Sequence, residues 1–240
     1  MENPGKDVPD QLMDIWLQDK RQVGDPPADE LIGQWVDQSG ISAARQLFDR
    51  LIRTVELPFR DLPPILRGFI DQQKEAWPTW AVESDISRAQ ALFVDHGPKL
   101  LLLLYFQSLP ILYACKNGAQ VFVRTGRLAH DPEALETFSR RIAETGQFLL
   151  EVMAPGALRP KGPALDYILK VRLIHAAIRH FVKTSGQWDA DSWGEPINQE
   201  DMAITLLTFG RTPMQGLEKF GLEVTPRERE AYWHSWKVAG

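Results

Sequence analysis

Hydrophobic residues along this chain recur mostly at intervals of three and four, the spacing that places them on one face of an α-helix. Alternating β-branched runs closed by tight turns, which predict strands, are nearly absent. The segment AQVFVR at residues 119–124 is the one strand candidate, and it is too short to found a sheet. We therefore expect an all-α fold, a single multi-helix domain spanning residues 1–240.

Proline and glycine divide this helical pattern. Residues 11–55 predict short amphipathic helices that break at Gly24-Asp25-Pro26-Pro27 and at Gly40. A longer helix should start after Ser84 or Asp85 and end at Gly97-Pro98, followed by an apolar helix at residues 100–106.

The later helices have clearer start signals. Asp131 should cap a helix that begins at Pro132 and ends near Met153, and another helix should run from Pro163 to Ser185. Asn198 predicts the start of a third helix, and the run Thr225-Pro226-Arg227-Glu228 has the form of a capping box for the last one.

The amino-acid composition argues against several classes of function. The net charge of −5 argues against a nucleic-acid partner, which would need a basic face. Eight Trp and eleven Phe are enough to wall a large apolar cavity. The single cysteine, Cys115, excludes a disulfide framework, a thiolate metal cluster and the two-cysteine attachment of a c-type haem.

Neither the N-terminus nor the most apolar run predicts a membrane segment. Residues 1–10 have no apolar signal core, and residues 100–106 are much shorter than the ~20 apolar residues of a spanning helix. We expect a cytoplasmic protein without an integral membrane segment. Its oligomeric state is not predicted.

The helix from Pro163 carries the most informative pattern. Arg172, His175 and Arg179 fall within roughly 60° of one another on a helical projection, on the face that also carries apolar residues. Two interpretations are open. Either the arginines reach Asp or Glu side chains and His175 is a core histidine, or His175 ligates a haem iron and the arginines neutralise its propionates.

The chain resembles the latex-clearing (rubber) oxygenases and the related fungal endoplasmic-reticulum-bound oxygenases. The resemblance rests on Arg172 and His175 in VRLIHAAIR, on Arg141 and Thr145 upstream, on WGEPINQEDMAITLLTF at residues 193–209, and more weakly on residues 125–128. It covers the chain from about Trp77 to the C-terminus, with residues 1–76 as a helical extension.

The resemblance implies a globin-like helical core that binds b-type haem, with His175 as the proximal iron ligand. It implies that Arg172, Arg179, Arg141 and Thr205 contact the haem, and that Arg141 and Thr145 act on bound dioxygen. The implied function is a haem-dependent oxygenase that uses O2 to cleave a C=C bond in an apolar or isoprenoid-like molecule. The alternatives are a peroxidase-like or gas-sensing haem protein, and a helical binding protein without haem.

Three departures from the family pattern modify this expectation. Glu144 stands where rubber-cleaving members can carry a lysine, and residues 124–128 contain no glutamate to serve as acid or base. We therefore expect a small olefin to be a better substrate than long polyisoprene. Family members usually continue past the position of Gly240, so the chain should be a short member or a fragment.

Overall fold

The computed structural model describes residues 10–53, 61–125 and 132–240, and every regular element in these ranges is a helix. The all-α, single-domain fold predicted from the sequence is confirmed. The elements are α1 (Asp10–Arg21), α2 (Pro26–Ser39), α3 (Ile41–Arg53), α4 (Pro64–Gln73), α5 (Glu83–Leu103), η2 (Leu104–Ser108), α6 (Leu109–Tyr113), α7 (Lys116–Arg124), α8 (Pro132–Met153), α9 (Pro163–Thr184), α10 (Ala190–Trp193), α11 (Gln199–Gly210), α12 (Thr212–Lys219) and α13 (Pro226–Ala239).

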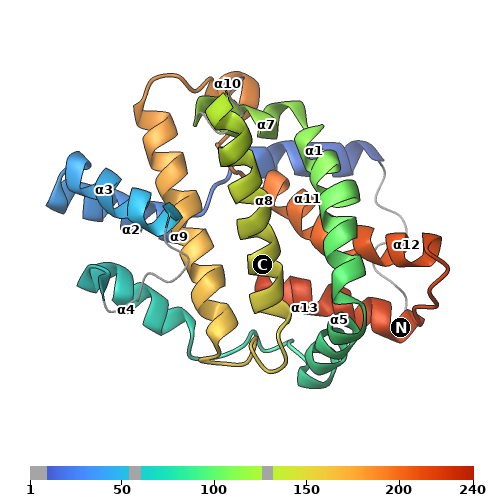
Figure 1. The fold of residues 1–240 in the computed structure, drawn as a ribbon. Coiled ribbons are helices and arrows are strands. Elements are labelled where there is room, and N and C mark those ends of the chain that lie inside the picture. The colour runs from blue at the N-terminus through green and yellow to red at the C-terminus, as the bar shows by residue number, and fades with distance from the viewer. Residues whose placement is uncertain (1–9, 54–60, 126–131) are drawn as a thin grey trace.

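Helices α8 and α9 stand side by side and antiparallel in the middle of the molecule (Figure 1), joined by residues 154–162. On one side, α8 packs with α5, η2, α12 and α13 around a hydrophobic cluster that includes Leu100, Leu149 and Trp236. Burial of these large side chains supplies most of the stabilisation on this side.

A second hydrophobic cluster lies on the other side of α9. There α2, α3 and α4 cover Leu169, Leu173, Ala176 and Ala177 of α9, which are all buried. Helix α9 also contributes Ala164 to the first cluster. This helix therefore belongs to both hydrophobic clusters.

Most of the predicted helix ends are confirmed. Helix α2 begins at Pro26 after the predicted break, with Asp25 as its cap, and ends before Gly40, whose φ is +81°. Asn198 caps α11 by accepting from the Asp201 N–H, and Thr225 forms the predicted capping box at α13. The predicted cap at Asp131 lies outside the described residues.

One local prediction is wrong. Helix α5 does not end at Gly97-Pro98 but continues to Leu103, and then into the π-helical turn η2. Pro98 removes one backbone donor, but its partner carbonyl would be that of Val94, a residue 62% exposed, so water can replace the lost bond. The strand candidate at residues 119–124 is helical and belongs to α7.

The helices in the described ranges were compared with the length and hydropathy of a membrane-spanning helix. No single helix there is both long and apolar enough to cross a bilayer, although Glu83–Tyr113 and Lys116–Arg124, bent by 96° at their junction, meet that criterion as a pair.

Candidate functional site

The predicted site residues of α9 lie on one face of the helix, next to the second hydrophobic cluster, where Phe69 and the start of α2 lie against the two arginines. Arg172, His175 and Arg179 share this face, and His175 is half-buried there. The sequence folds as a helix here because Pro163 starts it and the buried Leu and Ala positions recur at helical spacing. The α9 face is therefore held in place by packing on its other sides.

Arg172 forms an ion pair with the N-cap of α2. Its Nε and Nη2 donate to the two carboxylate oxygens of Asp25, at 2.6 and 2.9 Å. Burial would raise the pKa of Asp25, but the hydrogen bond and charge of Arg172 outweigh it, so this pKa lies below its usual value. The guanidinium carbon of Arg172 also lies 5.2 Å from the ring centroid of Phe69.

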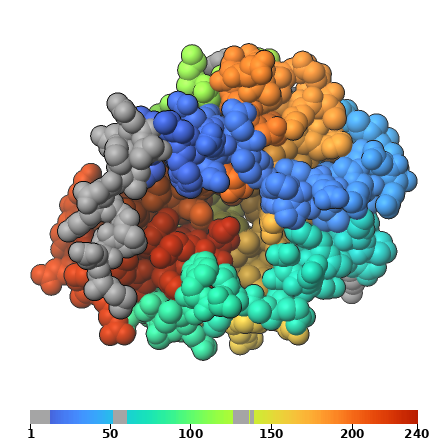
Figure 2. All heavy atoms as spheres, turned by 180° about the vertical axis from the view of Figure 1, so that it is seen from behind, coloured from blue at the N-terminus to red at the C-terminus, as the bar shows by residue number. Residues whose placement is uncertain are grey.

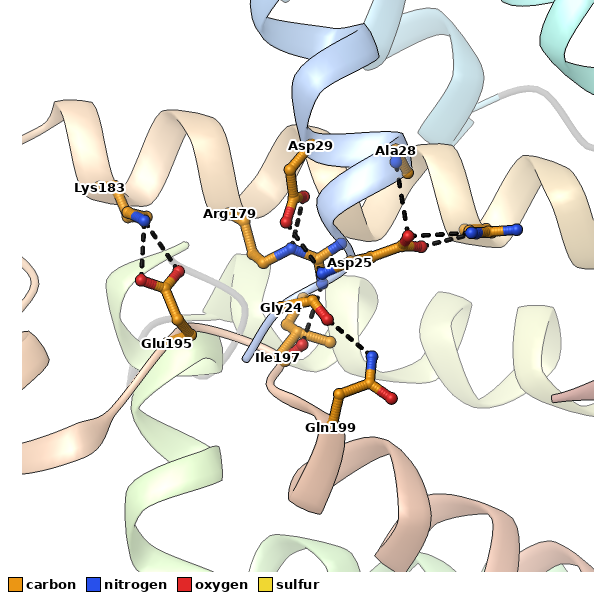
Figure 3. Close-up of polar contacts among 10 residues, drawn as sticks. Gly24, Asp25, Ala28, Asp29, Arg179, Lys183, Glu195, Ile197 and Gln199 are labelled. Carbon is orange, nitrogen blue, oxygen red and sulfur yellow. Dashed lines mark hydrogen bonds and ion pairs between the residues drawn. The ribbon is translucent and has the colours of Figure 1, made fainter. Parts of the chain in front are cut away.

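Arg179 is more deeply buried, with 3% of the residue exposed. Its Nε donates to Asp29 Oδ1 at 2.7 Å and its Nη1 to the Ile197 carbonyl at 2.9 Å (Figure 3). Its Nη2 is buried and has no hydrogen-bond partner among the described residues. Thus Arg179 is anchored by two acceptors and keeps one unused buried donor.

The backbone around Arg179 is adapted to this contact. A Cβ at Gly24 would come within 2.7 Å of Asp29 Oδ2 and 3.0 Å of Arg179 Cδ, so a larger residue there would displace one of these two side chains. Ile197 adopts φ 51°, a strained left-handed conformation for a β-branched residue, and its carbonyl accepts from Arg179. Gln199 completes the contact by donating to the Gly24 carbonyl at 2.7 Å (Figure 3).

These ion pairs are the contacts expected from the first of the two interpretations of the sequence, in which the arginines reach carboxylates. Both carboxylates come from the first third of the chain, which the motifs had left unplaced. Sequence reasoning missed them because Asp25 and Asp29 lie about 150 residues from their partners. The only local signal was their position at the start of a helix, which predicts a cap and not a partner.

The second group of predicted site residues lies on α8. Arg141 is largely buried, with its guanidinium carbon 4.3 Å from the ring centroid of Phe122 and its Nη1 without a partner among the described residues. Burial lowers the pKa of Arg141, and the nearby charges of Tyr113 and Glu144 oppose this shift. Arg141 is therefore a buried cation, held against an aromatic ring, with a donor to spare.

The two predicted threonines use their hydroxyl hydrogens within their own helices. Thr145 Oγ1 donates to the Arg141 carbonyl, and Thr205 Oγ1 donates to the Asp201 carbonyl, both at 2.8 Å. Each hydroxyl oxygen can still accept a hydrogen bond, but neither threonine is a free donor in this structure.

The register of α8 and α9 places the two groups at a similar height. Burial lowers the pKa of Lys170 on α9, and the charge of Glu144 on α8 opposes this, so the two side chains are neighbours. Since the helices are antiparallel (Figure 1), Arg141, three residues before Glu144, lies at about the height of Leu173 and His175. Glu144 thus interacts electrostatically with a lysine on α9.

Helix α11 reaches α8 through Phe209 and carries further half-buried apolar residues. Its residues 202–206, MAITL, are apolar except for Thr205, yet all five are only half-buried. Where α8 continues below Thr145, Phe148 contacts Phe209 and Trp236, with ring centroids 6.4 and 6.3 Å apart. The side of α8 that carries Arg141 thus continues, one turn beyond Thr145, into the aromatic contacts of Phe148.

The surface is hollowed on the face opposite to that of Figure 1. Figure 2 shows blue N-terminal, red C-terminal and teal segments framing this hollow, with yellow atoms of the α8–α9 region at its floor. A separate pocket of about 750 Å³ lies against α2 and α3, lined by Trp35, Leu47 and Leu62 among others, and none of the predicted site residues lines it.

Comparisons with known proteins agree with the motifs. The family model described as "ER-bound oxygenase mpaB/B'/Rubber oxygenase, catalytic domain" matches residues 97–240, more than half of the chain. A rubber oxygenase of Streptomyces sp. (strain K30) is 25% identical over 225 residues, which cover 92% of this chain and 53% of that protein.

A solved structure is similar as well. The structure of latex clearing protein LCP in the closed state matches with a TM-score of 0.69 at 24% identity, covering 92% of this chain and 58% of that one. This likeness confirms the fold, and the chain spans little more than half the length of either relative. With the family model matched over more than half of its residues, the chain belongs to the ER-bound oxygenase mpaB/B' and rubber oxygenase catalytic-domain family.

Proposed function

We propose that this chain is a haem-dependent oxygenase that binds b-type haem through His175 and uses dioxygen to cleave a C=C bond in a small apolar olefin. Membership of an oxygenase family supports the reaction class. The cofactor, the substrate and the site residues are our proposal, because the chain spans only part of its relatives' length.

The residues of α9 and α11 fit a haem. One neutral imidazole is enough to hold haem iron, and His175 offers it from a helix fixed by packing on its other sides. A porphyrin also needs apolar contacts, and Met202 and Leu206, one turn apart on α11, offer half-buried apolar side chains on one face. The single cysteine leaves non-covalent binding as the mode.

The observation that carries the proposal is the unpartnered Nη1 of Arg141. A buried donor without an acceptor is costly, commonly ~1–3 kcal/mol, and such groups in native structures call for a functional explanation. Arg141 lies at about the height of His175 on the neighbouring helix, against the ring of Phe122. We assign Nη1 the role of donating a hydrogen bond to an oxygen atom of the reactants.

When bound, haem would supply the iron chemistry with dioxygen. The chain's own residues then have three tasks. His175 holds the cofactor, Arg141 donates its hydrogen bond to oxygen, and Met202 and Leu206 of α11 exclude water from the apolar substrate. Thr145, whose hydrogen is used in its own helix, contributes an acceptor oxygen. A donor acts strongly in a water-poor site because no solvent competes with it.

The roles of the α9 arginines need a separate test, because their carboxylate partners leave few N–H donors for a haem propionate. Arg172 donates two hydrogen bonds to Asp25, whereas the buried Nη2 of Arg179 donates to no described residue. We propose that only Arg179 reaches a propionate. Arg179→Leu should then lose haem to apomyoglobin faster than the wild type, and Arg172→Leu should not. Equal rates for all three proteins would assign both arginines to structure alone.

The first experiment is an absorption spectrum of the purified protein with matched histidine variants. His175→Ala should abolish or sharply reduce haem content while the helical circular dichroism is kept. His180→Ala is the control, since His180 lies on the same helix and its ring contacts Phe181 instead. A His175→Ala protein that retains full haem loading and an unchanged spectrum would overturn the assignment.

The second experiment concerns the reaction. Arg141→Met keeps a long apolar stem without the donor, and it should lower O2 uptake with olefins about 10²–10³-fold while haem content changes little. Carbonyl products across a panel of olefins would identify the substrate class. Ready peroxide-driven oxidation of dyes with no olefin turnover would instead indicate the peroxidase-like alternative.

A further inference from the structure

A stripe of apolar residues on α5, η2 and α6 faces solvent. It consists of five exposed residues spaced four apart: Val94, Pro98, Leu102, Phe106 and Pro110. The exposed fractions are 62% for Val94, 47% for Leu102 and 77% for Phe106. Single exposed apolar residues are ordinary, but five in register on one continuous helical segment are not.

The π-helical turn η2 limits the winding of this stripe. In an α-helix, residues four apart drift by about 40° per step, so Val94, Pro98 and Leu102 follow a slowly winding line. The π-helical turn at Leu104–Ser108 holds about one extra residue, which reduces this drift between Leu102, Phe106 and Pro110. An irregular turn thus aligns the most exposed phenylalanine with its apolar neighbours.

From Val94 to Lys116, the segment carries one acidic residue, Asp95, and two lysines, Lys99 and Lys116, a balance of +1. Between Gly97 and Cys115 the only charged residue is Lys99, and Lys116 follows directly after. Both lysines are exposed, and Asp95 is the one exposed acid that precedes them on this part of α5. Lysine stems can lie over apolar surface while their ammonium groups reach phosphate groups at a membrane interface.

We propose that this stripe docks on the surface of a lipid bilayer that carries anionic headgroups. Phe106 and Leu102 would enter the boundary between headgroups and acyl chains, and Lys99 and Lys116 would contact lipid phosphates. The helix would lie in the plane of the interface, as expected for an apolar stripe along one face.

A second copy of the chain is a poorer occupant. Stable protein interfaces use about 20–30 residues on each side, and this stripe presents five on a single helix. Binding to a bilayer needs no such minimum number of residues, because each inserted side chain contributes its own favourable free energy of transfer out of water.

The test is flotation of the purified full chain with vesicles of phosphatidylcholine, with and without phosphatidylserine. The wild type should float with both and more strongly with phosphatidylserine at low salt. Phe106→Glu and Leu102→Glu should lower the bound fraction about tenfold or more. Ile41→Glu is the matched control, since Ile41 is 49% exposed on α3, at the opposite side of the molecule (Figure 1).

A charge variant provides an independent arm. Lys99→Glu combined with Lys116→Glu should reduce binding to phosphatidylserine vesicles and leave binding to phosphatidylcholine vesicles nearly unchanged. No flotation of the wild type, or equal flotation of the stripe variants and the Ile41→Glu control, would overturn the proposal. So would a dimeric wild type that Phe106→Glu converts to a monomer without changing vesicle binding. None of these measurements depends on haem.

Discussion

Replacing Arg179 by leucine should destabilise the protein markedly, because the change removes a buried cation from two acceptors. Asp29 would lose its ion-pair partner at 2.7 Å and keep the hydrogen bond from the Asp25 N–H, and the Ile197 carbonyl would lose its donor at 2.9 Å. Breaking a fully buried pair costs ~3–5 kcal/mol, but the Asp29 side chain is 32% exposed, so water can solvate part of its charge. We expect the free energy of unfolding to fall by about 2–4 kcal/mol.

The same helix offers a matched control. Lys183, one turn further on α9, forms an ion pair with both oxygens of Glu195 at 2.8 Å, but its side chain is 49% exposed. Lys183→Leu should therefore cost only ~0–1 kcal/mol. Arg172→Leu should fall between the two, at about 1–2 kcal/mol, because its side chain is 31% exposed.

The assay is urea unfolding of the variants followed by circular dichroism, with the slope against urea checked for constancy. If Arg179→Leu loses no more stability than Lys183→Leu, then burial does not decide the contribution of these ion pairs, and the reasoning fails. An additional Asp29→Asn change should cost less in the Arg179→Leu protein than in the wild type, since the two residues share one interaction.

Two further predictions concern the same region and the first hydrophobic cluster. Asp25→Asn keeps a good helix cap but loses the ion pair with Arg172, so it should lower stability at neutral pH by about 1–2 kcal/mol. The folded-state pKa of Asp25 lies below its ordinary value of 3.8. The stability that the ionised carboxylate contributes is therefore present above that value and is lost as the pH falls through the folded pKa. Urea titrations at several pH values should show that the wild type and the variant become equally stable in acid. Gly146→Ala should destabilise the protein by about 1–3 kcal/mol, because the added Cβ would lie 1.9 Å from Tyr105 Oη, and Tyr105→Phe should relieve part of this loss in the double variant. An equal loss with and without Tyr105→Phe would contradict that explanation.

The helices and their ends were largely predictable, since they depend on local signals. Asn198 and Thr225 cap the helices that the sequence assigned to them. Helix α5 escaped prediction because its continuation through Pro98 depends on tertiary burial of Leu100 and Leu103, which outweighs the loss of one backbone hydrogen bond. Local sequence carries no information on that packing.

The candidate site was predictable only in part, for a related reason. Helical periodicity placed Arg172, His175 and Arg179 on one face, which the structure reproduces. The partners of the arginines could not be found, since pairing across about 150 residues depends on the assembled fold. The spare donors on Arg141 and Arg179 likewise emerge only when all their neighbours are placed.

Because α9 belongs to both hydrophobic clusters, neither half of the molecule should unfold or fold independently. Peeling α2, α3 and α4 away would expose Leu169 and Leu173 to water, and loosening the other half would free Ala164 at the start of the same helix. A fragment cut at residue 97, where the family match begins, would interrupt α5 and leave that α9 face bare. In a hydrogen-exchange experiment, the most protected amides on both sides of α9 should therefore show the same free energy of opening, equal to the free energy of global unfolding.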